Sequence, residues 1–260
     1  MEPLSLQGRC LGGQPEDPTL VILHGMLGSS RNWATVGPAL AKGFQVWALD
    51  LRNHGSSPHS PVHSYEAMKV DLETFRVAMG WEKIVLLGHS MGGKAAMRYA
   101  VDYPERVSKL MIVDIGPGDH DPYHAREVEA LAALPLQCLE NRREADEILA
   151  RDVPDWAMRQ FLLTNLRRRG KVWEWQVNLP VLQNNLVFLA QSPMTSGDRF
   201  FEPTLLVRGA ESTFVSDAEV ELAKTYFPEL EAVTIPRAGH NVHVENKEAF
   251  VAAVRGFLED

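Results

Sequence analysis

Two glycines flank Ser90 in the segment Gly88-His89-Ser90-Met91-Gly92, and this segment constrains the fold of the chain more than any other. The apolar residues 84–87 before it predict a buried strand, and residues 94–103 after it are compatible with a helix. In such a sharp turn the serine has a strained backbone, so its neighbours must be small enough for strand and helix to pass closely. The segment therefore predicts that the Ser90 hydroxyl stands above the end of a sheet as a nucleophile.

Short apolar runs rich in β-branched residues recur along the chain and alternate with segments of helical periodicity, such as 68–79 and 250–258. Runs of this kind are typical of buried parallel strands. Their alternation with helices predicts an α/β fold with a parallel sheet covered on both faces. Apart from 84–87, the predicted strands are residues 20–23, 46–49, 110–113, 205–207 and 232–235.

The alternation stops between residues 117 and 200, where helical patterns at 125–134 and 145–150 follow one another without a clear strand. This predicts a helical insertion that divides a core domain into residues 1–116 and 201–260. An insertion over the carboxyl edge of a parallel sheet covers the place where such folds bind ligands. The basic cluster Arg167 to Arg169 with Lys171 is interpreted as a solvated helix end rather than as an anion site.

A second interpretation of the serine segment is a phosphate-binding loop, because residues 88–94 fit the spacing G-x-x-x-x-G-K. That motif needs a serine or threonine after the lysine to bind magnesium. Ala95 occupies this position, so the nucleotide-binding interpretation is disfavoured.

A serine hydroxyl is a weak nucleophile unless a base accepts its proton, so the segment predicts a histidine further along the chain. His240 follows the last predicted strand and precedes the C-terminal helix, where the order serine, acid, histidine places the base. His243 is interpreted as a supporting, partly buried residue.

Two regions compete to supply the acid that orients His240. Asp114 directly follows the predicted strand 110–113, at the carboxyl edge of the sheet, and we favour it. After strand 205–207 the usual position of an acid holds Ser212, so Asp217 and then Glu211 remain as alternatives.

The loop after strand 20–23 carries glycines at positions 25 and 28, as expected for a donor to an oxyanion. We predict that the backbone N–H groups of Met26 and Met91 form the oxyanion hole. His24 is predicted to hold this loop by hydrogen bonds. His120 and His124 are interpreted as surface residues rather than metal ligands, because no carboxylate or cysteine set accompanies them.

The formal net charge of −8 argues against nucleic acid as a partner, because phosphate binding requires a basic surface. The sequence has no signal-like start and no run of about 18 apolar residues, so a secreted or membrane-spanning protein is not expected. Its two cysteines, Cys10 and Cys138, do not suggest a disulfide framework. These features favour a cytoplasmic protein.

Several motifs together resemble the α/β-hydrolase superfamily along nearly the whole chain: His24-Gly25, residues 50–55, residues 88–94 and Gly239-His240. Within that superfamily, residues 52–55, 91–94, 113–115 and 161–165 look like those of small capped bacterial esterases related to a mitochondrial abhydrolase-domain protein.

This resemblance implies a mostly parallel, eight-stranded sheet with a helical cap inserted after the sixth strand. It also implies a serine carboxylesterase that needs no cofactor or metal and acts on a small-molecule ester or acyl thioester, with Asp114 as the acid. Alternatives on the same scaffold are a cofactor-free haloperoxidase, a carbon-carbon bond hydrolase and a non-catalytic ligand receptor. Acyl chain length, alcohol preference and oligomeric state depend on how residues 117–200 shape the pocket, so the sequence leaves them open.

Overall fold

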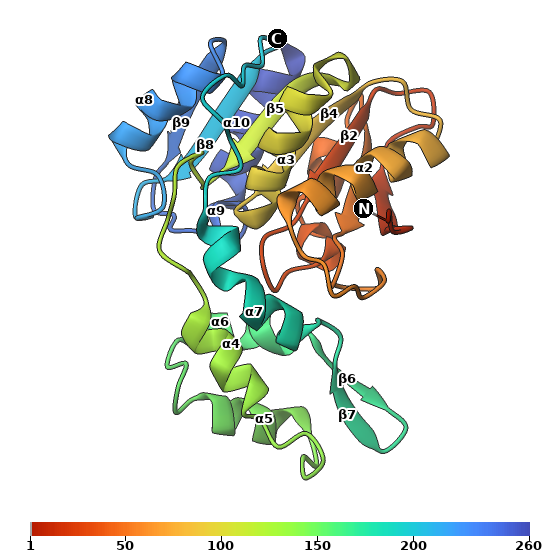
Figure 1. Cartoon of the computed structure of the whole chain (residues 1–260), viewed down its shortest axis with the longest axis vertical. Coiled ribbons are helices and arrows are strands. Elements are labelled where there is room, and N and C mark those ends of the chain that lie inside the picture. The colour runs from red at the N-terminus through yellow and green to blue at the C-terminus, as the bar shows by residue number, and fades with distance from the viewer. Residues whose placement is uncertain (1) are drawn as a thin grey trace.

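The computed structural model describes residues 2–260 as an open, twisted sheet between two layers of helices, with a smaller helical lobe beside it (Figure 1). The strand order is β1-β3-β2-β4-β5-β8-β9, in which β1 is antiparallel to β3 and all other neighbours are parallel. The strands are β1 Gln7–Gly12, β2 Thr19–Leu23, β3 Gln45–Asp50, β4 Ile84–His89, β5 Val107–Val113, β8 Thr204–Gly209 and β9 Leu230–Ile235. The predicted α/β class with a mostly parallel sheet is confirmed.

Alternate residues of the central strands face two separate apolar cores, as strand geometry requires. On β2, Val21 and Leu23 pack into one core, whereas Leu20 and Ile22 pack into the other. The first core is covered by α2 (Tyr65–Ala78), α3 (Met91–Asp102) and α8 (Asp217–Tyr226). The second is covered by the short α1 (Gly37–Leu40) and by α10 (Lys247–Glu259).

The main sheet has seven strands within residues 2–260, rather than the expected eight, so the helical insertion follows the fifth strand and not the sixth. Residues 2–6 form no strand, and the Leu4 N–H donates to the Asp71 carboxylate at 2.7 Å instead of joining a ladder. Strand β1 was not predicted from the sequence. It is an edge strand with exposed or half-exposed residues, so it lacks the apolar run of a central strand.

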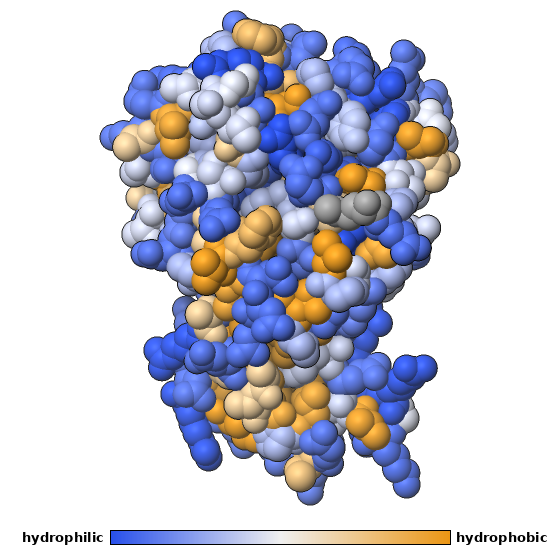
Figure 2. All heavy atoms as spheres, viewed as in Figure 1, coloured by the Kyte–Doolittle hydropathy of each residue, from blue (hydrophilic) through white to orange (hydrophobic). Residues whose placement is uncertain are grey.

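Residues 117–200 form the lobe below the sheet in Figure 1. It contains four helices and a two-stranded antiparallel hairpin, within the described chain: α4 Ala125–Ala132, α5 Arg142–Leu149, α6 Trp156–Leu163, β6 Leu166–Arg169, β7 Val172–Trp175 and α7 Leu179–Ala190. Apolar side chains gather at the waist between this lobe and the sheet, over α7 (Figure 2).

The hairpin contradicts two interpretations of the sequence. The basic cluster Arg167 to Arg169 lies in strand β6 and is not a helix end, and the insertion is not purely helical. Gly170 has a φ of +66° and makes the tight turn, while Trp173 is buried on the inner face of the hairpin. Two four-residue strands are too short to show a clear alternation in sequence.

Lys94, on the first turn of α3, connects the sheet to the lobe. Its buried ammonium group donates to the carbonyl groups of Gly118, Ala190 and Gln191, each at 2.9 Å. These carbonyls belong to both chain connections between sheet and lobe. All three protons of the ammonium group are therefore used inside the protein, unlike those of a phosphate-binding lysine, whose charge faces its ligand.

Helix α3 passes so close to β4 and to the end of β2 that only glycine fits at two positions. A Cβ atom on Gly88 would lie 2.2 Å from the Gly92 carbonyl oxygen, and one on Gly92 would lie 2.5 Å from the Leu23 carbonyl oxygen. These contacts explain the glycine on each side of Ser90.

None of the helices in residues 2–260 combines the length and hydropathy that a membrane crossing requires.

We predict that Gly92→Ala lowers the free energy of unfolding by about 1–3 kcal/mol, because backbone atoms must move to accept the methyl group. A chain of this size should then lose roughly 2–4 °C in Tm per kcal/mol. Gly256→Ala is the matched control, since a Cβ atom there meets nothing within 4 Å inside α10. Thermal unfolding of both variants checks the prediction, and equal Tm values would contradict it.

Candidate active site

Ser90 lies between β4 and α3 with φ 53° and ψ −120°, a conformation that costs energy for a residue with a Cβ atom. Its side chain lines a cavity at the carboxyl edge of the sheet. The first amides of α3 have no carbonyl partner one turn earlier in the helix. The Met91 N–H, the first of the helix, is therefore available to an oxygen atom bound beside Ser90.

Asp114 and His240 form a buried hydrogen-bonded pair. The His240 Nδ1–H donates to the Asp114 Oδ2 atom at 2.8 Å, although 126 positions separate the two residues. Asp114 follows β5 directly and has a φ of 50°, which turns its carboxylate toward the end of β8. There it also accepts the Gly209 N–H at 2.8 Å and the Ser212 hydroxyl at 2.5 Å.

The structure brings Asp114, and not the alternative acids, to His240. Asp217 begins α8, is exposed, and forms an ion pair with Arg208 at 2.7 Å. Glu211 is also exposed. Ser212 holds the place where sequence patterns suggested an acid, and its hydroxyl donates to the carboxylate from the neighbouring strand.

Burial shifts the pKa values of this pair in opposite directions, because it disfavours the charged form of each group. It raises the pKa of Asp114 to about 6, against the opposing hydrogen bonds from Ser212 and Gly209. It lowers the pKa of His240 to about 3, and neighbouring His124 and His120 act in the same direction. At pH 7 the pair therefore consists of a carboxylate and a neutral imidazole whose Nε2 atom is a free proton acceptor.

Aromatic side chains fix the positions of His240 and of the neighbouring His243. Phe214 stacks on the imidazole with ring centroids 3.7 Å apart, and the His89 Nε2–H donates to the His240 carbonyl at 2.9 Å. His243 is buried and stacks on Trp33 at 4.3 Å, in agreement with a supporting role. Phe214 was not identified from the sequence, because it follows β8 in a loop without a recognisable motif.

Histidines hold the loop that carries Met26. The Leu51 N–H donates to His24 Nε2 at 3.0 Å, which confirms the predicted structural role of His24. The Leu27 N–H donates to His54 Nε2 at 3.1 Å. From the lobe, the Asn165 amide donates to the Leu27 carbonyl at 2.7 Å. Met26 is thereby held beside Ser90, and both residues line the same cavities.

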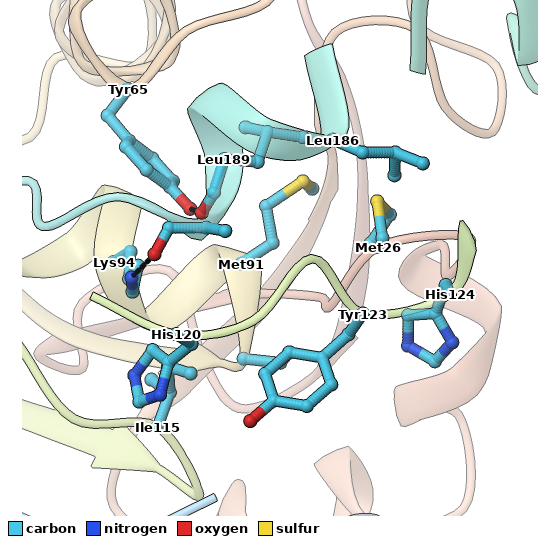
Figure 3. A pocket seen from close by; sticks show the side chains of 12 residues that line it. Met26, Tyr65, Met91, Lys94, Ile115, His120, Tyr123, His124, Leu186 and Leu189 are labelled. Atoms are coloured by element: carbon cyan, nitrogen blue, oxygen red, sulfur yellow. Dashed lines mark hydrogen bonds between the residues drawn. The ribbon is translucent and has the colours of Figure 1, made fainter. Parts of the chain in front are cut away.

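Two cavities meet at Ser90. The larger, about 660 Å³, lies between the lobe and the sheet and includes His240, Phe214 and Met158 in its lining. The smaller, about 40 Å³, lies under α7 (Figure 3). Ser90, Met26 and His124 line both. The arrangement presents a serine, a neutral base and unpaired amides to a bound molecule, which is the requirement for acyl transfer.

Among residues 2–260, no cluster of three or more histidine, cysteine or acidic side chains could hold a metal ion. His124 lies within 3.7 Å of Glu127, one turn into α4.

Comparison with known proteins links this geometry to one family. A family model described as "alpha/beta hydrolase fold" matches residues 18–247. The mouse protein named sn-1-specific diacylglycerol lipase ABHD11 is 36% identical over 99% of this chain and 86% of its own length. Esterase YbfF of Escherichia coli (strain K12) is 31% identical over 99% of each chain. A solved structure named marine microorganism esterase has a TM-score of 0.94 at 33% identity, and covers 98% of this chain and 99% of its own.

We predict that His240 remains neutral when the pH falls from 8 to 6. Its pKa is lowered, so it accepts a proton only below its ordinary range, and the first proton taken up near pH 6 belongs to the pair it forms with Asp114. Nitrogen-15 NMR of the imidazole, assigned with a His240→Gln variant, measures this directly. An imidazolium signal with a midpoint above pH 6.5 would contradict the prediction, because it would show that burial does not lower the pKa of His240.

Proposed function

This chain belongs to the α/β-hydrolase fold family, in an esterase group related to abhydrolase-domain proteins, and we propose that it is a serine carboxylesterase that works through an acyl-enzyme on Ser90. Relatives named esterases and lipases match nearly its full length, so it is a hydrolase that acts on ester bonds. The proposal concerns the mechanism and the residues that carry it.

In the first step, the Ser90 hydroxyl oxygen attacks the ester carbonyl carbon while the Nε2 atom of His240 accepts its proton. Asp114 keeps the imidazole in the tautomer with a proton on Nδ1 and stabilises the imidazolium that forms. The carbonyl oxygen becomes an oxyanion, which the Met26 and Met91 N–H groups stabilise. His240 then returns its proton to the alcohol oxygen, the carbon–oxygen bond breaks, and the alcohol leaves.

In the second step, His240 takes a proton from a water molecule, whose oxygen attacks the acyl-enzyme carbonyl. The tetrahedral intermediate collapses, Ser90 recovers its proton, and the carboxylic acid leaves. An acyl thioester follows the same route with a thiol as the leaving group, so we include thioesters among the substrates.

The observation that carries this proposal is the 2.8 Å hydrogen bond between His240 and the buried Asp114, with His240 and Ser90 facing one cavity. A carboxylate without a partner at this depth is costly. Here three donors compensate the cost, and one of them is the imidazole that must be oriented.

We further propose that residues 117–200 are a cap domain over the site, with the core in residues 1–116 and 201–260. The cap contributes Met158 and Phe161 from α6 to the larger cavity and Leu186 and Leu189 from α7 to the smaller one. We also propose a cytoplasmic location, which the free and exposed Cys10 and Cys138 support.

Replacing the proposed nucleophile tests the mechanism. Ser90→Ala should lower kcat on p-nitrophenyl acetate by on the order of a thousandfold or more, because no acyl-enzyme can form. The Tm should not fall, since alanine keeps the small side chain at this turn. Covalent labelling by a fluorophosphonate probe should occur in the unaltered chain and disappear in the variant. Equal turnover in both proteins would falsify the assignment.

Replacing each candidate acid tests the role of Asp114. Asp114→Asn should lower kcat by on the order of a thousandfold, because an amide does not stabilise the imidazolium and favours the wrong tautomer. Asp217→Asn is the matched control at an exposed ion pair and should remain within about twofold of the unaltered chain. A larger loss in the control than in Asp114→Asn would transfer the role to Asp217.

A further inference from the structure

The two cavities that meet at Ser90 differ in which catalytic groups they contain. Ser90 and Met26 line both, whereas His240 lines only the larger cavity. A tetrahedral intermediate on Ser90 would carry an acyl chain and a leaving group, and the two cavities offer them chemically distinct spaces.

The position of His240 decides which substituent lies on which side. The imidazolium formed in the first step must donate its proton to the leaving oxygen, so that oxygen has to lie within hydrogen-bond reach of Nε2. The alcohol or thiol part of the substrate must then extend into the cavity that His240 lines. The acyl part is left with the smaller cavity under α7.

We propose that the cavity lined by Met26, Tyr65, Met91, Leu186 and Leu189 is an acyl pocket that restricts this enzyme to short, unsubstituted acyl groups, while large leaving groups enter the cavity beside His240. This inference rests on the proposed function, because it assigns the two sides of the same acyl-enzyme.

The size of the smaller cavity sets the length limit. Its volume of about 40 Å³ corresponds to about three water-sized groups, since one such group needs roughly 10–15 Å³ by the same measure. That space accommodates the carbons of an acetyl to butanoyl group. The larger cavity, about 660 Å³, imposes no comparable limit on the leaving group.

The wall of the smaller cavity is mostly apolar, although His120, Tyr123 and His124 also line it, and this composition favours a hydrocarbon chain. The thioethers of Met26 and Met91 point toward the leucines of α7 (Figure 3). The Tyr65 hydroxyl donates to the Leu189 carbonyl at 2.6 Å, and the Lys94 ammonium donates all its protons to backbone carbonyls. Lys94, the one lysine or arginine in the lining, is therefore not available to an acyl carboxylate, and these bonds fix α7 as the end wall of the pocket.

A series of p-nitrophenyl esters from acetate to octanoate tests the length limit on the full chain. We expect kcat/KM to fall at least about tenfold between butanoate and octanoate, because a pocket that cannot expand excludes the added methylene groups. A flat profile, or one that rises toward octanoate, overturns the proposal.

Variants on α7 test which wall sets the limit. Leu186→Ala should raise the ratio of octanoate to acetate kcat/KM by about tenfold, and Leu186→Phe should lower the ratio of butanoate to acetate by a similar factor. Val187→Ala is the matched control, since this neighbouring side chain is 67% exposed on the same helix. Leu186→Phe keeps the test decisive if Leu186→Ala unfolds the cap. Unchanged ratios in the Leu186 variants, or equal changes in the control, overturn the proposal.

A variant in the other cavity separates the two sides. Met158→Ala should change KM for naphthyl acetate relative to methyl acetate while the acyl-length profile stays as in the unaltered chain. If Met158→Ala shifts the acyl-length profile, the acyl group occupies the larger cavity and the proposal is overturned. Failure of the proposed function has a different signature: ester hydrolysis that Ser90→Ala does not remove, or no hydrolysis of any ester.

Discussion

The close approach of α3 to β4 at Gly88 and to the end of β2 at Gly92 is the constraint on which the site depends. Ser90 has a positive φ at this turn, where a Cβ atom on Gly88 would meet the Gly92 carbonyl and one on Gly92 would meet the Leu23 carbonyl. The strain is offset by the surrounding sheet and helix, which are almost entirely buried. The same turn starts α3 beside the serine, so it positions both the proposed nucleophile and the Met91 N–H, one of the two proposed oxyanion donors.

The acid and base proposed here, and the amide that donates to the acid, come from three different strand ends that meet at one edge of the sheet. Asp114 follows β5, Gly209 ends β8, and His240 lies beyond β9. Parallel strands bring these residues together, although they are far apart in sequence. Burial favours the neutral forms of both titrating groups, and the hydrogen bonds to Asp114 keep it ionised at pH 7 while His240 stays a neutral base.

Lys94 couples the core to residues 117–200 through three carbonyls on the two chain connections. Lys94 and Met91 lie on the same helix, so the hydrogen bond from Lys94 to the end of α7 fixes the position of α7 relative to the Ser90 turn. The lobe therefore has a fixed position over Ser90, and this position leaves the smaller and the larger cavity beside the serine.

The sequence alone determined the strand-turn-helix at Ser90, the alternation of strands and helices in the core, and the candidate residues at the ends of strands. These features depend on neighbours along the chain: apolar runs, glycines beside a serine, and polar residues directly after strands. It did not reveal β1, whose exposed edge position needs no apolar pattern, nor the β6–β7 hairpin.

Only the tertiary structure decided which acidic side chain lies beside His240 and what shape the pockets have. Whether Asp114, Asp217 or Glu211 reaches His240 depends on which strand ends lie side by side, and the stacking of Phe214 on the imidazole depends on the fold of a loop. The division into two cavities depends on where Lys94 and Asn165 anchor the lobe. Such contacts join segments about a hundred residues apart, and their energies exist only once the chain has folded.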